Sequence, residues 1–269
     1  MLDAERIREP FTDVPRLDGI EVFAEIGSTN DYLLAQPRPK VGRCRVALAN
    51  HQTAGRGRMD RTWESPPSSG LYLSLAYTFA RGANGLSGLT LALGIGVAEA
   101  LERLGIDGIG LKWPNDIIAR DGKLGGILTE TRSAPDGATV VAGIGVNVDF
   151  RGDGDRALES SSIGRIVDLA ACTDDVPSRE SLAVTTIEIL LETLARFDSH
   201  GFAPFAAAWQ RYDWLRGQTI TVDTGSEVVA GSVDGIDSDG ALLLRDGDER
   251  RSIVSGSVIA SGSRVHPDE

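Results

Sequence analysis

Residues 111–128 read LKWPNDIIARDGKLGGIL, and short apolar runs alternate in them with turn-forming residues. Pro114 has no N–H to donate to a neighbouring strand, so we expect a strand that breaks at Pro114 and then resumes. The residues DGK at 121–123 predict a hairpin turn, after which the sheet continues. Asn115 and Asp116 therefore lie where a loop meets the edge of a sheet.

The same stretch holds two of the three lysines in the chain, Lys112 and Lys123. Lysine presents a compact point charge where arginine presents a planar fork, so these two lysines are predicted to do what arginine cannot; chance clustering is the alternative. If they meet across the hairpin near Asp116, the cluster suits a phosphate and a divalent metal. A Lys112–Asp116 surface pair, worth at most about 1 kcal/mol, is the other interpretation.

The segments around this stretch predict a mixed α/β domain at residues 1–215 and a small all-β domain at 216–269. Alternating or continuous apolar residues predict strands at 20–26, 44–53, 71–79, 124–132 and 139–150. Helical spacing and N-cap residues predict helices at 27–36, 86–106, 178–198 and 202–214, the first capped by Ser28 or Thr29. Residues 151–163 are polar and predict a surface loop. From 216 onward, turn signals at short intervals predict the second domain.

Composition narrows the function classes. The chain has 269 residues, 39 acidic and 27 basic, and a net charge of -12, which argues against binding to DNA or to an anionic membrane. Cys44 and Cys172 are its only cysteines and form no CxxC, which favours a reducing compartment. We see no apolar run of membrane-spanning length and no signal peptide, and we expect a cytoplasmic protein. Both adaptation to high salt and arginine-biased codon use fit an acidic, lysine-poor chain.

A second motif, HQTAGRGRMDRTW at residues 51–63, is a short basic loop in this acidic chain. Gly55 and Gly57 let main-chain N–H groups approach a ligand, and the three arginines suit carboxylate or phosphate. The spacing matches neither a GxxxxGK[ST] loop nor a GxGxxG fingerprint. The loop is either an anion clamp or a set of solvated arginines.

Six motifs in order, GSTN, HQTAGRGRMDRTW, GLYLS, LKWPNDI, GKLGGIL and GIGVNV, resemble the biotin protein ligase family. This resemblance implies an α+β fold, with a mixed sheet and helices related to class II aminoacyl-tRNA synthetases, followed by an SH3-like β-barrel. It implies that biotin and Mg-ATP give biotinyl-5′-AMP, and that biotin then passes to a lysine of a biotin carboxyl carrier domain.

The resemblance also implies roles for single residues. Expected biotin contacts are Ser28, Thr29, Asn30, Gln52, Gly55, Arg56, Gly57, Arg58, Lys123 and Gly126. Expected ATP or adenylate contacts are Arg58, Arg61, Trp63, Asn115, Lys123 and Asn147. Expected catalytic residues are Lys123, Arg58, Lys112 and Asp116, with Asp116 also holding Mg²⁺. Gly143 and Gly145 fit either close packing or close approach of a ligand.

The sequence departs from the family pattern at two places. Met59-Asp60 stands where a basic or polar residue and glycine are more usual, which adds a negative charge and removes an expected hinge. Gly125 replaces the usual alanine, which we expect only to enlarge the space slightly. Many relatives act as repressors through an N-terminal helix-turn-helix, but only about twenty residues precede the first strand here, so we expect no DNA binding. A homodimer is possible, since relatives often dimerise through the catalytic sheet.

Two other functions fit parts of the sequence. An enzyme of the same broad fold could act on lipoate or octanoate, although an apolar acid would not need the polar set Ser28, Thr29 and Gln52. A non-catalytic biotin sensor would predict a nucleic-acid module and would not need Lys123.

Overall fold

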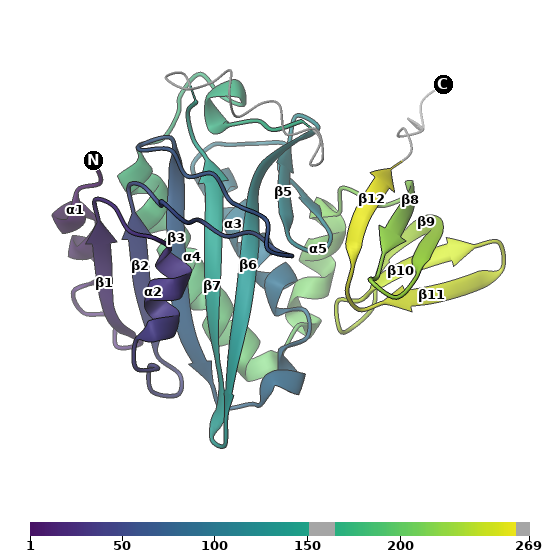
Figure 1. The fold of residues 1–269 in the computed structure, drawn as a ribbon, viewed down its shortest axis with the longest axis horizontal. Helices are drawn as coiled ribbons and strands as arrows, with labels where there is room; N and C mark the ends of the chain where they lie inside the picture. The colour runs from purple at the N-terminus through teal and green to yellow at the C-terminus, as the bar shows by residue number, and fades with distance from the viewer. Residues whose placement is uncertain (151–164, 262–269) are drawn as a thin grey trace.

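The computed structural model describes residues 1–150 and 165–261, and the predicted surface loop at 151–163 lies outside them. Seven strands form one sheet and five form a second (Figure 1). The strands of the first sheet are β1 (Leu17–Phe23), β2 (Cys44–Ala49), β3 (Gly70–Phe79), β4 (Gly110–Lys112), β5 (Asp116–Ala119), β6 (Gly122–Ala134) and β7 (Gly137–Asn147). The helices are α1 (Ala4–Arg8), α2 (Thr29–Ala35), α3 (Leu89–Arg103), α4 (Arg179–His200) and α5 (Ala206–Tyr212).

The first sheet has the order β1-β2-β3-β7-β6-β5-β4 and is mixed, because β1 and β2 are parallel while the other pairs are antiparallel. This confirms the expected α+β class with a mixed sheet. All ten residues of β3 are buried, so its apolar alternation does not mark one solvated face. Helices cover both faces of this sheet instead, which explains the burial.

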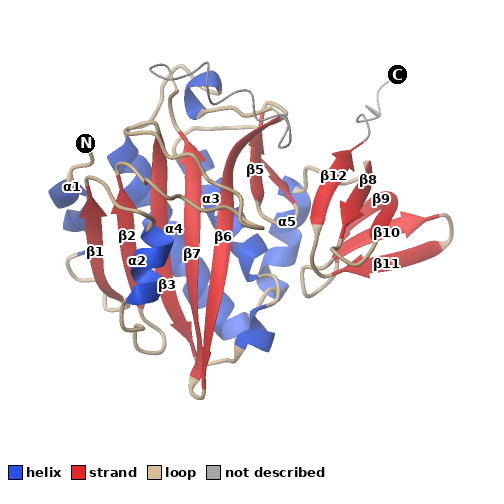
Figure 2. Ribbon diagram, viewed as in Figure 1, coloured by secondary structure: helices blue, strands red, loops and turns tan. Residues whose placement is uncertain are grey.

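Figure 2 shows α2 on one face of the seven-stranded sheet and α3 and α4 on the other. Helix α2 begins at the N-cap Ser28, whose Oγ accepts from the Asp31 N–H, as the sequence predicts. Helix α3 is buried along most of its length and packs on α4. A Cβ at Gly96 would lie 2.7 Å from Thr193 Oγ1, so this helical glycine lets α3 and α4 approach closely.

The structure corrects several predicted elements. The chain does not resume its direction after Pro114: β4 and β5 form an antiparallel hairpin that pairs Lys112 with Asp116. The next turn is at Arg120 and Asp121, which both take positive φ, rather than at DGK. The first strand begins at Leu17 and ends at Phe23, not at residue 26.

The helix predicted at 202–214 is shorter, and one helix was not predicted at all. Only Ala206–Tyr212 is α-helical, after a 3₁₀ turn at Ala203–Phe205. Helix α1 spans five residues, too few for a clear apolar period, and is capped by Asp3. One segment, Ala83–Arg103, does reach the length and mean hydropathy of a membrane span, contrary to the expectation from sequence. Because 61% of its most apolar 18-residue stretch is buried in the protein, its apolar character is that of a core helix.

The second sheet follows α5 and is wholly antiparallel, in the order β11-β10-β9-β8-β12. Its strands are β8 (Thr219–Asp223), β9 (Val228–Ile236), β10 (Leu242–Asp246), β11 (Glu249–Ile253) and β12 (Ser257–Ser261). Apolar residues of β8, β9 and β10 alternate between buried and solvated positions, as the period-two pattern predicts. Its β12 edge lies beside the first sheet (Figure 1).

Candidate active site

A cavity of about 600 Å³ lies over β6 and β7, under the loop at 51–63, and reaches the β12 edge of the second sheet. The sequence-predicted residues that line it are Ser28, Thr29, Asn30, Gln52, Arg56, Gly57, Arg58, Arg61, Trp63, Lys112, Asn115, Asp116, Lys123, Gly126 and Asn147. The remaining predicted residue, Gly55, does not line it. A Cβ at Gly55 would lie 2.3 Å from the Trp63 carbonyl oxygen, so this glycine serves the packing of the loop on itself.

One end of the cavity is polar and buried. Ser28, Thr29 and Asn30 are each 3–4% exposed, at the start of α2. The Gln52 Oε1 accepts from the Thr29 N–H at 2.9 Å and lies 3.1 Å from the Thr29 hydroxyl. Ser74 on β3 donates to Asn30 Oδ1 at 2.6 Å, and its Oγ lies 2.7 Å from Thr29 Oγ1. Buried polar groups cost little free energy when they form hydrogen bonds with one another. An apolar ligand would leave their remaining donors and acceptors without hydrogen bonds.

The loop at 51–63 is a tight hairpin. The Gly57 N–H donates to the Arg61 carbonyl at 2.6 Å, and Arg56 pairs with Thr62. At its tip, Met59 and Asp60 have φ of 55° and 57°, the left-handed region that glycine favours. The usual glycine is therefore absent at a place where the backbone would suit it.

Two arginines of the loop, Arg56 and Arg58, have different surroundings. Arg56 is 2.6 Å from both Asp31 and Glu130. Burial would lower its pKa, but the hydrogen bonds and charges of these carboxylates raise it overall. Arg58 donates to Asn115 and to the Gly256 carbonyl, each at 3.2 Å, and burial lowers its pKa. Arg56 is therefore charge-compensated, whereas Arg58 is the arginine that links the loop to the second sheet.

Near the middle of the cavity, Lys123 Nζ lies 2.7 Å from Asp116 Oδ1. The alternative pair considered from sequence, Lys112 with Asp116, is not the close one; register makes those residues neighbours, but Lys112 Nζ lies 5.8 Å from the centre of the Trp214 ring. Burial lowers the pKa of Lys112, the charge of Lys123 lowers it further, and Asp116 opposes both. Two lysines and one carboxylate therefore share a partly desolvated site that favours an added anion.

Trp63 lies on main chain rather than in the hydrophobic core. A Cβ at Gly145 would be 2.5 Å from its Cε2, and one at Gly126 would be 3.5 Å from its Cζ3. The indole N–H is buried and has no acceptor among the described residues. A Cβ at Gly143 would meet Asn30 Oδ1 at 2.5 Å. The glycines of β7 thus allow close packing of Trp63 and Asn30, and both glycines also line the cavity, where a ligand can approach them.

Two other predictions change in detail. Asn147 lines the cavity, but its amide nitrogen donates to the Val167 carbonyl at 3.0 Å and to the Lys123 carbonyl at 3.4 Å, which leaves its side-chain oxygen as the group available to a ligand. A Cβ at Gly125 would lie 2.5 Å from the Gly145 carbonyl oxygen. Alanine therefore does not fit here without a shift of β6 against β7, and the effect is larger than the slight gain in space expected from sequence.

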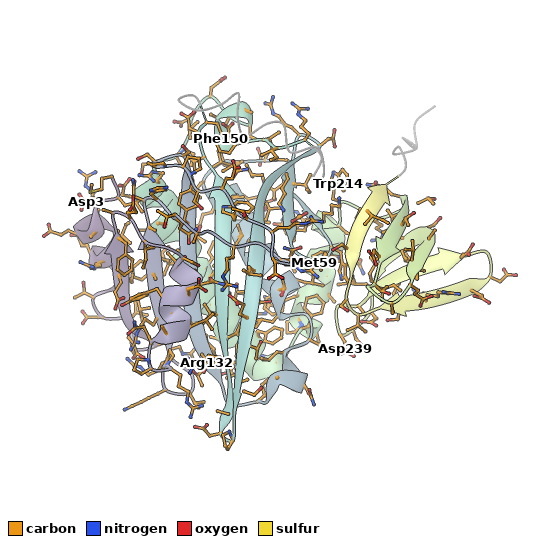
Figure 3. All side chains as sticks on the ribbon, in the orientation of Figure 1. Asp3, Met59, Arg132, Phe150, Trp214 and Asp239 are labelled. Atoms are coloured by element: carbon orange, nitrogen blue, oxygen red, sulfur yellow. The ribbon has the colours of Figure 1, made fainter. Side chains whose placement is uncertain are left out.

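Several residues at the cavity were not predicted. Ser74 lines the polar end, and Ser257 and Val258 line the far side from β12. Glu130 does not line the cavity, but its Oε2 accepts from Asn30 Nδ2 at 2.9 Å. A serine inside the apolar run of β3 was the available signal for Ser74. Met59 lies between the two sheets (Figure 3), where its Sδ accepts from the Ser257 hydroxyl at 3.2 Å. Nothing in the local sequence of β12 indicates this contact.

The donor set fits a metal ion only if phosphate oxygens supply most of the ligands. No group of three His, Cys, Asp or Glu side chains that could hold a metal occurs in residues 1–150 and 165–261. Asp116 and Glu64 are the carboxylates that line the cavity. Mg²⁺ commonly binds through one or two carboxylates plus substrate phosphates, so Asp116 is compatible with an ion that arrives with a nucleotide.

Comparison with protein families gives two matches. Residues 22–147 match the model described as the biotin/lipoate A/B protein ligase family, and residues 216–260 match the biotin protein ligase C terminal domain. The bifunctional ligase/repressor BirA of Escherichia coli is 36% identical over 235 residues, which cover 85% of this chain and 70% of that protein. The biotin–[acetyl-CoA-carboxylase] ligase of Paracoccus denitrificans is 28% identical over 254 residues, which cover 90% of this chain and all of that protein.

Solved structures agree with these matches. The biotin protein ligase of Aquifex aeolicus in complex with biotin and ATP superposes with a TM-score of 0.75 at 26% identity, covering 92% of this chain and 100% of that one. At this coverage the match extends over both sheets.

Proposed function

The chain belongs to the biotin protein ligase family, and we propose that it activates biotin with ATP to biotinyl-5′-AMP and transfers the biotin to one lysine of a biotin carboxyl carrier domain. One observation supports this most directly: a single cavity joins a buried polar end to a cluster of cations. The polar end suits a ureido ring, and the cations suit a carboxylate and phosphates. The relatives named above carry the same activity in their names.

We assign biotin to the polar end, against Ser28, Thr29, Asn30 and Gln52, under main chain at Gly57 and Gly126. A ureido group has one acceptor and two donors, and buried hydroxyl and amide groups can match each of them. An analogue without these groups would leave them unpaired, and such mismatches cost about 1–3 kcal/mol each.

We assign the adenylate to the cationic part. In the first step the biotin carboxylate attacks the α-phosphorus of ATP, and pyrophosphate leaves. Lys123 would donate to the oxygens that gain charge, after giving up part of its contact with Asp116. Arg58 and Arg61 would neutralise phosphate, Asn115 and Asn147 would contact the nucleotide, and Trp63 would stack on adenine. Mg²⁺ held by the phosphates and Asp116 would neutralise charge on the nucleotide.

In the second step the ε-amino group of the carrier lysine attacks the acyl carbonyl, and AMP leaves. We propose that Arg56, Arg58 and the loop tip cover the mixed anhydride in the interval, so that water does not hydrolyse it. Lys112 and Asp116 lie beside the cavity on the β4–β5 hairpin, where they could receive the incoming lysine. In this arrangement the reaction is accelerated by electrostatic stabilisation and by positioning of the reactants, rather than by a histidine that acts as general acid or base.

We further propose the division into a catalytic domain at residues 1–215 and an SH3-like domain at 216–269, supported by the C-terminal family match at 216–260. A cytoplasmic location and the absence of DNA binding also remain proposals; free Cys44 and Cys172 support the first, and the net charge of -12 supports the second. Homodimer formation stays a prediction that sedimentation velocity tests.

The test is ATP–pyrophosphate exchange with biotin, lipoate, octanoate or no acid, at low and at molar salt. We expect exchange with biotin alone. Exchange with lipoate or octanoate would mean that the fold is assigned correctly but that the acid substrate is not biotin. A folded protein that binds biotin but gives no exchange at any salt concentration would favour the non-catalytic sensor.

A further inference from the structure

One turn of the second sheet, residues 254–256 between β11 and β12, lies against the tip of the loop at 51–63. The Gly256 carbonyl in this turn accepts from Arg58 Nη2 at 3.2 Å. The next residue, Ser257, donates to Met59 Sδ at 3.2 Å, and Figure 3 shows Met59 between the two sheets. The tip of the loop is therefore docked on the second sheet through two neighbouring residues.

This turn is held closely on its own sheet. Gly256 is buried, and a Cβ on it would lie 2.8 Å from both the Asp223 carbonyl oxygen and Val222 Cγ1 on β8. The following residue, Ser257, pairs with Asp223 where β12 meets β8. The Gly256 carbonyl is therefore an acceptor with a fixed position, since the turn cannot shift toward β8.

A separate contact fixes the second sheet against the first. Trp113, in the turn between β4 and β5, is 2% exposed and donates its indole N–H to the Gly240 carbonyl at 3.2 Å. A Cβ at Gly240 would lie 2.9 Å from Gly88 Cα at the start of α3, so main chain packs on main chain here. The second sheet therefore keeps its place without help from the loop at 51–63.

Arg58 is held at two different nitrogens, one from each sheet. Its Nη1 donates to Asn115 Oδ1 at 3.2 Å, and the Asn115 amide nitrogen donates to the Ile127 carbonyl at 2.9 Å on β6. Its Nη2 donates to Gly256 of the second sheet. A guanidinium can turn about a single hydrogen bond, but two bonds to different nitrogens fix its plane. The bond to Gly256 is thus not a duplicate of the bond to Asn115.

The two acceptors orient Arg58 without compensating its charge, because a carbonyl oxygen and an amide oxygen are both neutral. Arg56, by contrast, is 2.6 Å from the carboxylates of both Asp31 and Glu130. Arg58 is half-buried and lines the cavity. An anion in the cavity therefore meets a directed positive charge in a partly desolvated place, where the attraction is stronger than in water.

We propose that Gly256 is a positioning residue whose main-chain carbonyl holds Arg58 over the adenylate, so that the second sheet helps to retain the reactive intermediate. This inference rests on the proposed function, since it takes biotinyl-5′-AMP as the ligand. If the turn at 254–256 is displaced, Arg58 keeps its charge and its bond to Asn115 but loses its fixed plane. The tip of the loop then leaves the second sheet more often, and adenylate escapes.

The test is Gly256→Ala in the full chain, because the added Cβ forces the turn and its carbonyl to shift against β8. The first measurement is the rate at which biotinyl-5′-AMP is lost from the preformed complex without carrier protein. We expect loss to be about 5- to 50-fold faster, since one hydrogen bond to a charged group is lost or lengthened. Biotin affinity, measured by calorimetry, should stay within about twofold of wild type because the polar end of the cavity is untouched.

The second measurement needs no activity. Trypsin cleaves after arginine, and cleavage of the Arg58–Met59 bond in the ligand-free protein reports how often the tip of the loop leaves the second sheet. We expect cleavage of this bond to be at least about threefold faster in Gly256→Ala, because one of the contacts that dock the tip is weakened.

Two further variants show whether Gly256 acts through Arg58. Gly247→Ala is the matched control: it lies in the β10–β11 turn of the same sheet at a φ of 58°, and its added Cβ would meet no atom within 4 Å. It strains the second sheet without moving the turn at 254–256, so adenylate loss should stay within about twofold of wild type. Arg58→Lys keeps the charge but presents one nitrogen, which cannot bond both acceptors. Adding Gly256→Ala to Arg58→Lys should change adenylate loss by less than about twofold, because the contact is already absent.

A folded Gly256→Ala that loses adenylate at the wild-type rate overturns the inference, as does an equal increase in Gly247→Ala or a full additional increase on top of Arg58→Lys. If Gly256→Ala does not fold, Ser257→Leu decides: a larger side chain at the 3.2 Å contact with Met59 must push the tip off the turn, and unchanged adenylate loss then overturns the inference. Wild-type protein that forms no adenylate refutes the proposed function instead, and the cleavage rates still show whether the turn holds the loop.

Discussion

Replacing Gly145 with alanine should displace Trp63 and impair ATP use while leaving biotin binding largely intact. A Cβ at this position would lie 2.5, 2.6 and 2.8 Å from three atoms of the indole. Carbon atoms in contact prefer about 3.5–4.0 Å, so the ring must move away from β7 by about 1 Å. The direction of that movement is into the part of the cavity assigned to the nucleotide.

The magnitude follows from the size of the shift. A misplacement of about 1 Å can cost up to about 100-fold in a positioned site, and lost stacking on an aromatic costs about 1–3 kcal/mol. We therefore expect the KM for ATP to rise by about 10- to 100-fold, equivalent to about 1.4–2.7 kcal/mol. Biotin affinity should change by less than about threefold, because Asn30 meets Gly143 rather than Gly145.

The assay is ATP–pyrophosphate exchange with ATP varied at saturating biotin, beside calorimetry with biotin alone. Gly94→Ala is the matched control: its Cβ would meet Leu111 at 3.5 Å, an ordinary contact, inside helix α3. Alanine should raise stability there by about 0.5–1 kcal/mol and leave the KM for ATP as it is. A folded Gly145→Ala protein with a normal KM for ATP would show that Trp63 does not position the nucleotide.

Three further predictions concern charged residues. Lys123→Met should lower the exchange rate by about 10- to 100-fold through loss of a charge-assisted hydrogen bond, and Lys123→Arg should not restore it; near-normal exchange in either variant argues against the assigned role. Because burial lowers the pKa of Lys112, the unfolded state binds more protons between that pKa and the ordinary one, so stability rises with pH in this window. Lys112→Met should therefore flatten the dependence of the free energy of unfolding on pH just below the ordinary lysine pKa of about 10.4, measured by urea denaturation, and an unchanged slope contradicts this. Arg179 donates to Asn50 Oδ1 at 2.6 Å at the base of the basic loop. Arg179→Met should therefore lower the free energy of unfolding by about 1–3 kcal/mol and speed proteolysis within residues 51–69. A cleavage rate equal to that of the wild type would show that this contact does not hold the loop.

Local patterns in the sequence were sufficient for most of the first sheet. The strands β2, β3, β6 and β7 and the helices α2, α3 and α4 follow from apolar period, length and capping residues. The β4–β5 reversal did not follow, because Pro114 shows where pairing stops but not the direction in which the chain leaves. Helix α1 was not predicted, because it is shorter than two turns and its apolar residues show no helical period.

The motifs predicted which residues form the candidate site, but they did not predict the contacts among those residues. Ordered motifs brought together almost every expected residue around one cavity, because the motifs lie at the ends of strands or at the start of α2. The residues that pair within the site are far apart in the sequence, so their contacts are seen only in the structure. Glu130 is separated from Arg56 by 74 positions and from Asn30 by 100, and neither distance leaves a local signal. The contact of Arg58 with Gly256 spans 198 positions.

The main-chain surface under Trp63 and Asn30 limits how this pocket can vary. Gly126 and Gly145 are register partners on β6 and β7, and Gly143 lies two residues before Gly145 on the same face. A surface of backbone has no side chain to exchange for a smaller one, so mutation can only add atoms to it. Space for a bulkier ligand must therefore come from the walls, and any lineage that alters acid preference would first have to change the residues that lie on these glycines rather than the glycines themselves.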